Sequence, residues 1–84
     1  MRQLLDAATL RAYHQEIDLY LGRVRDLLQA LSHRRLNAEQ QRVVAQVRAL
    51  ANQAARMRDN DPIASRNLAQ RADLLARDLW ASLK

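Results

Sequence analysis

Few side chains in this sequence are spaced as catalytic or metal-binding groups are. His14 and Asp18 lie one helical turn apart with Glu16 between them, a spacing that metal ligands on a helix also use. A structural or catalytic zinc site needs at least three protein ligands, so we interpret these residues as polar groups of a solvated face. His33 stands beside two arginines just after the first apolar stripe, so we interpret it as part of the polar end of a helix. We expect no metal and no cofactor.

The possible nucleophiles are also scattered. Thr9, Ser32, Ser65 and Ser82 are candidates, but none stands in a glycine-flanked elbow, and the sequence has no cysteine. Catalysis needs an acid, base or nucleophile converging in a concave site that excludes water. Nothing in the sequence indicates such a set, and we expect a non-enzymatic protein.

Arginine is the dominant charged residue. Fourteen basic residues oppose nine acidic ones, giving a net charge of +5, and Lys84 is the only lysine. A charge of this sign favours loose association with nucleic acid or anionic lipid. The candidate phosphate contacts are three arginine pairs and one further arginine: Arg23, Arg25, Arg34, Arg35, Arg56, Arg58 and Arg66. Because these clusters are spread over both ends of the chain and acids precede Arg66, we keep nucleic-acid binding only as the alternative function.

The elements that carry these residues are predicted to be helices. Ala, Leu, Arg and Gln fill most positions, and one Gly and one Pro leave almost no turn chemistry, which excludes sheet. A first helix is predicted over about residues 6–32, because seven apolar residues recur at alternating spacings of three and four. They are Leu10, Tyr13, Ile17, Tyr20, Val24, Leu27 and Leu31. Leu21 and Leu28 widen this stripe on one side, as in a bundle helix.

Two further helices follow from capping signals. Asn37 and Gln40 have the spacing of a capping box, which predicts a helix over about residues 38–58. Asp61 followed by Pro62 is a strong start signal, because Asp caps well and Pro fits the first helical turn; it predicts a helix over about residues 62–83. In that helix Asp73 and Arg77 are spaced for an ion pair on a polar face.

Both connections are short, so consecutive helices are predicted to be antiparallel neighbours, and up-down-up is the simplest arrangement. The sequence therefore predicts an all-α fold, a single antiparallel three-helix bundle over residues 1–84, which can assemble into a larger helical oligomer. Small residues beside the second turn favour close approach of the second and third helices there. A chain of this size buries only about two-thirds of its unfolded surface, so a further interface would add stability.

Apolar residues that fall outside the stripes are candidates for that interface. They are Leu4, Leu5, Leu19, Leu74 and Trp80. Five such residues in so short a chain favour burial against another copy of the chain or against another helical protein. We therefore predict a protein–protein interaction or structural assembly module that associates with itself.

One stretch resembles a known kind of sequence. Within residues 50–79, the run from Asn60 to Ala72 and the following Leu74-Leu75 form a capped helix rich in Ala and Arg. It resembles the Ala/Arg-rich helical hairpins of uncharacterised bacterial envelope proteins and lipoproteins. The resemblance implies a bacterial structural or interaction module and carries over no catalytic residue.

Membrane association is disfavoured on two grounds. No apolar run approaches the roughly 18 residues that span a bilayer. The apolar face of the first helix, which could otherwise lie on a membrane surface, is predicted to be used in the core. We expect a soluble protein of the bacterial cytoplasm or periplasm.

Overall fold

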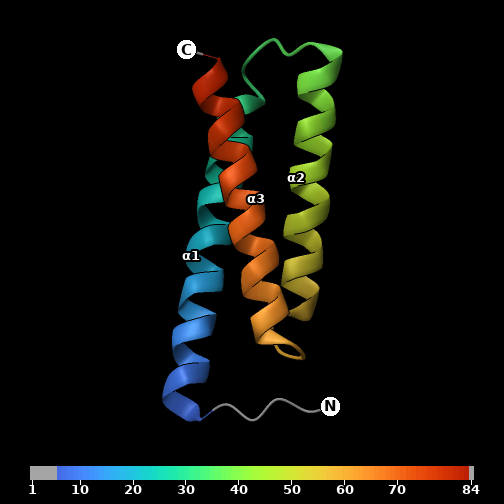
Figure 1. Ribbon diagram of the computed structural model, residues 1–84. Coiled ribbons are helices and arrows are strands. Elements are labelled where there is room, and N and C mark those ends of the chain that lie inside the picture. Colours follow the sequence, from blue (N-terminus) through green and yellow to red (C-terminus); the bar gives the residue numbers. More distant parts are fainter. Residues whose placement is uncertain (1–5, 84) are drawn as a thin grey trace.

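The computed structural model describes residues 6–83, which form three helices and, within that range, no strand. Helix α1 spans Ala7–Leu31, α2 spans Ala38–Met57 and α3 spans Pro62–Ser82. The helices run up, down and up, so α1 and α3 are parallel and α2 is antiparallel to both (Figure 1). The all-α, three-helix prediction is confirmed, and the predicted helix ends agree with the observed ones to within about one residue.

Each helix begins at a capping side chain, and the caps of α2 and α3 are those that the sequence indicated. The Asp6 carboxylate accepts a hydrogen bond from the Thr9 backbone N–H at 2.7 Å. Asn37 and Gln40 form a full capping box, with each side chain accepting from the other residue's backbone N–H at 2.8 and 2.9 Å. The Asp61 carboxylate accepts from the Ala64 N–H at 3.1 Å, and Pro62 follows it at the start of α3. These bonds satisfy backbone donors that would otherwise lack partners at the helix starts.

Helix α3 is the central element of the bundle. It packs against both α1 and α2, whereas α1 and α2 meet each other only slightly, although a short connection joins them. The reason is a stripe of small, fully buried residues on α3, which lets both neighbouring helices approach its axis. The stripe consists of Ser65, Ala69, Ala72 and Ala76. The short connections thus predicted the helix directions correctly, but α1 and α2 are not close neighbours.

The core lies along α3 in two clusters. Nearer the α2–α3 turn, Ile17 of α1 and Ala54 of α2 pack with Ala69. Toward the other end, Val24 and Val47 pack with α3 alanines and are surrounded by partly buried aliphatic residues of all three helices. The predicted heptad stripe of α1 is confirmed, because Ile17, Val24 and Leu31 are its fully buried members. The predicted close approach at the α2–α3 turn is confirmed as well, and a buried hydrogen bond from the Ser65 hydroxyl to the Ala54 carbonyl oxygen, 2.6 Å long, fixes it.

The bundle is elongated, with principal extents of 44 × 20 × 15 Å. Its length is set by α1, since a helix of 25 residues rises about 37 Å. The first turns of α1 extend past the α2–α3 turn (Figure 1). The molecule therefore has one exposed helical arm and a narrow cross-section, which leaves much helix surface in contact with water.

Candidate interaction surfaces

Two of the five predicted interface residues are the most exposed large apolar residues of the described chain. Leu19 is 54% exposed and Leu74 is 52% exposed. Trp80 is partly buried, and Leu4 and Leu5 lie outside the described residues. The structure thus places Leu19 on α1 and Leu74 on α3 in water, as the stripe pattern predicted.

Helix geometry places each of these two leucines on the outward side of its own helix. On α1, Leu21 faces α2, and Leu19 lies about 160° away from it around the helix, on the side remote from α2. On α3, Ala72 is buried in the core among residues of both α1 and α2, and Leu74 lies about 160° away from it around the helix. The two side chains therefore lie on the outward sides of two neighbouring parallel helices, α1 and α3. We call this surface the α1–α3 face; it comprises Leu19, Arg23 and Asp26 of α1 and Gln70, Leu74 and Arg77 of α3.

A buried carboxylate lies at the centre of the α1–α3 face. Asp73 is 0% exposed, and one of its carboxylate oxygens lies 3.6 Å from Nη1 of Arg23 and 3.3 Å from Nε of Arg77. Neither carboxylate oxygen has a hydrogen-bond partner. The spacing of Asp73 and Arg77 predicted their ion pair, but the prediction of a polar face was wrong for Asp73. Arg23 of the neighbouring helix covers the carboxylate, and the sequence gives no signal of a partner fifty residues away.

Trp80 is partly covered at the other end of the bundle. The Arg34 guanidinium lies over the indole ring, 5.3 Å from its centroid, and donates a hydrogen bond to the Leu83 carbonyl oxygen at 3.0 Å. A cation over an aromatic face is attracted by the ring's negative charge distribution. This contact ties the connection after α1 to the end of α3, so Trp80 has a structural partner that the sequence did not indicate.

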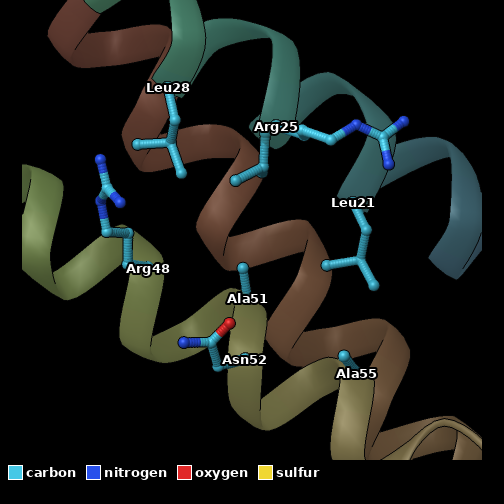
Figure 2. A pocket seen from close by; sticks show the side chains of 8 residues that line it. Leu21, Arg25, Leu28, Arg48, Ala51, Asn52 and Ala55 are labelled. Atoms are coloured by element: carbon cyan, nitrogen blue, oxygen red, sulfur yellow. The ribbon is translucent and has the colours of Figure 1, made fainter. Parts of the chain in front are cut away.

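A second surface lies between α1 and α2, where these helices separate. Its volume is about 400 Å³, and α3 lies behind it (Figure 2). The groove, called here the α1–α2 groove, is lined by Leu21, Val24, Arg25 and Leu28 of α1 and by Arg48, Ala51, Asn52 and Ala55 of α2. The leucines that widen the α1 stripe stand opposite alanines of α2, and these small residues leave the space unfilled. Its charged lining residues are both arginines.

The seven candidate phosphate contacts do not form one patch. Arg34 and Arg35 lie in the α1–α2 connection, and Arg56 and Arg58 lie near the opposite end of the bundle (Figure 1). Several are already engaged. Arg23 pairs with Asp73, Arg66 lies 3.2 Å from the Glu16 carboxylate and stacks over Tyr13, and Arg34 covers Trp80. Within residues 6–83, Arg25, Arg35 and Arg56 make no ion pair.

His14 and Asp18 have a structural use that sequence reasoning missed. The Asp18 carboxylate accepts two hydrogen bonds from the Arg58 guanidinium, both 2.8 Å long, and this pairing holds the pKa of Asp18 below its usual value. His14 Nε2 lies 3.2 Å from the Arg58 carbonyl oxygen. A carbonyl only accepts hydrogen bonds, so Nε2 is the protonated nitrogen. Both residues fasten α1 to the end of α2.

The same contacts account for the metal-like spacing in α1. Glu16 points to Arg66 on α3, while His14 and Asp18 meet Arg58, so the three side chains do not converge. Among residues 6–83 there is no group of three His, Cys, Asp or Glu side chains placed to hold a metal ion.

Comparison with known proteins gives no relative. No protein-family profile, curated protein or solved structure matches the chain. Across residues 6–83 no helix is both long and apolar enough to cross a membrane. The two surfaces described above are therefore the basis for inferring function.

Proposed function

We propose that this protein is a non-enzymatic helical interaction module that associates with itself through the α1–α3 face. The observation that carries the proposal is the exposure of Leu19 and Leu74 on two adjacent helices of a small bundle. Single exposed leucines are ordinary, but two on neighbouring helices offer apolar surface that association can bury.

The charges of the α1–α3 face suit a second copy of the same chain. The face carries the arginines Arg23 and Arg77 together with Asp26, which lies about two helical turns beyond Leu19. In a two-fold pairing the same patch meets itself in reversed orientation, so cations of one copy can oppose acids of the other. A face of a single sign would instead repel its own copy.

The free energy gained by burying the exposed leucines is small, which implies weak association. Burying the exposed half of a leucine contributes about 1 kcal/mol, so four leucines in a two-fold dimer contribute roughly 4 kcal/mol. Association costs about 4–15 kcal/mol in lost freedom of motion, so the leucines alone do not hold a dimer and the flanking charge pairs must add to them. We expect a dimer that forms at about 100 µM or above.

Sedimentation equilibrium tests the proposal over a range from about 10 µM to 1 mM. We expect the apparent mass to rise above 9.7 kDa with concentration for the wild type and to stay monomeric for Leu19→Gln/Leu74→Gln. Ala45→Gln/Ala49→Gln, on the exposed side of α2, is the matched control and should behave as the wild type. A compact monomer at every concentration, or equal loss in the control, would contradict the proposal.

Nucleic-acid binding gains no specific support from the geometry. Four of its seven candidate residues make ion pairs or stack on an aromatic ring within the bundle, and the arginines lie at both ends of it.

A further inference from the structure

The α1–α2 groove has the dimensions of a helix-docking site. Its walls run from Leu21 to Leu28 on α1 and from Arg48 to Ala55 on α2, eight residues in each case, so each wall is about two helical turns long. Helices dock in such grooves by placing apolar side chains at positions i, i+3 or i+4, and i+7, which also span two turns.

The arrangement of the three helices leaves a position for a fourth. Helices α1 and α2 are antiparallel, both pack on α3, and they barely touch each other, so the bundle is open on the side opposite α3. A helix seated there would contact both α1 and α2, as the diagonal member of a four-helix bundle does. Leu21 and Leu28, which are only partly buried, would then be covered.

The charged residues of the α1–α2 groove indicate which charges a docking helix would carry. Arg25 stands on the α1 wall and Arg48 on the α2 wall, no acidic residue lines the groove, and neither arginine makes an ion pair within residues 6–83. Figure 2 shows both guanidinium groups at the outer edge, beyond the apolar floor. Carboxylates flanking an apolar stripe would meet these cations. A second copy, with a net charge of +5, would bring more positive charge to the same place.

We propose that the α1–α2 groove binds an acidic amphipathic helix of a different protein. Its apolar stripe would contact Leu21, Leu28 and Ala51, and its flanking Glu or Asp residues would pair with Arg25 and Arg48. The surface used is remote from the α1–α3 face, so this binding is independent of self-association.

Two synthetic peptides of about 16 residues test the proposal. Both are held helical by lactam bridges and carry the same Leu/Ala stripe at i, i+3, i+4 and i+7, but one has Glu and the other Lys at the flanking positions. Fluorescence anisotropy with labelled peptide at low salt measures binding. We expect the Glu peptide to bind at least about tenfold more tightly than the Lys peptide, which corresponds to about 1.4 kcal/mol.

Charge reversal in the groove gives the sharper readout. Arg25→Glu/Arg48→Glu should invert the preference, so that the Lys peptide binds more tightly. Arg35→Glu/Arg56→Glu changes the net charge equally at exposed arginines outside the groove and should keep the wild-type preference. All four positions are exposed, and circular dichroism confirms folding of each variant. Equal binding of the two peptides, or the same inversion in the control variant, would overturn the proposal.

A further variant separates this site from the α1–α3 face. Leu19→Gln/Leu74→Gln should bind the Glu peptide as the wild type does. Loss of peptide binding in that variant would instead assign the peptide to the α1–α3 face and overturn the proposal for the groove.

Discussion

At the scale of single residues, Asp73 is the polar group with the least favourable surroundings. Its carboxylate is sealed from water, lacks hydrogen-bond donors and relies on two arginines at 3.3 and 3.6 Å. The two arginines are much more exposed than the carboxylate: the Arg23 and Arg77 side chains remain 47% and 56% exposed. If the carboxylate is removed, water can therefore solvate both arginines. If the arginines are removed, the buried carboxylate stays out of reach of water.

This difference in exposure predicts that removing the arginines and removing the carboxylate change the free energy of unfolding by different amounts. Arg23→Gln/Arg77→Gln leaves a buried charge uncompensated and should lower the free energy of unfolding by about 2 kcal/mol, less than for a fully buried pair because the lost partners were half-exposed. Asp73→Leu removes the buried charge and should change stability by no more than about 1 kcal/mol, in either direction. Urea denaturation followed by circular dichroism measures both values.

The control for this comparison is Arg42→Gln/Arg71→Gln, which removes two exposed arginines that make no ion pair within residues 6–83. It should be close to neutral. A larger loss in Asp73→Leu than in Arg23→Gln/Arg77→Gln would show that the carboxylate stabilises the fold despite its burial.

Residue-level roles were the hardest to predict from the sequence. The exposure of Leu19 and Leu74 was predicted, because a residue outside a regular stripe faces away from the core whatever its neighbours are. The burial of Asp73, the bond from His14 to the end of α2 and the cover of Trp80 by Arg34 were not. Each depends on a partner at least forty residues away, and helical periodicity carries no information on register between helices.

At the scale of elements, the helices are defined by local signals, which explains why they could be predicted closely. Three side-chain caps mark the starts, and the apolar periodicity marks the faces. The relation between elements was harder, since sequence proximity suggested that α1 and α2 pair, whereas the small residues of α3 place it between them.

One residue of α1, Gly22, has a lower helix propensity than the rest of the helix. Gly22 has a helical conformation, and a Cβ added there would meet only Arg25 Nη2 at an ordinary 3.8 Å. Gly22→Ala should therefore raise the free energy of unfolding by about 0.5–1 kcal/mol, because alanine loses less backbone freedom on folding. Thermal denaturation measures the gain, and Ala45→Gly on exposed α2 should show a loss of similar size. A destabilised Gly22→Ala would contradict the open surroundings of this residue.

At the scale of the whole molecule, several polar contacts join α1 to the rest of the bundle, and the one with the shortest distances joins Asp18 to Arg58. Hydrogen bonds from the guanidinium lower the pKa of Asp18. A carboxyl group whose pKa is lower in the folded state adds stability above its unfolded pKa of about 3.9. That contribution disappears as the pH falls through the folded pKa, so it is present at neutral pH and absent in strong acid.

Asp18→Asn should thus cost less than about 1 kcal/mol at pH 7, since the Asp18 side chain is 59% exposed and solvent screens the pair. The difference from the wild type should shrink steadily as the pH falls below about 4. Urea denaturation at several pH values tests this, with Asp26→Asn, an exposed acid of the same helix that makes no ion pair within residues 6–83, as the control. A difference that persists unchanged in acid would show that the ionised form of Asp18 is not the stabilising one.

The central position of α3 has a consequence for how the chain folds during its synthesis. Because α1 and α2 barely touch, a nascent chain that ends before Pro62 has two amphipathic helices and no surface on which to bury either. Both halves of the core contain α3 alanines, and the contacts of α1 with α3 close a loop of about fifty residues. The bundle therefore cannot assemble stepwise as the chain leaves the ribosome, and its fold is completed only when the last helix has emerged.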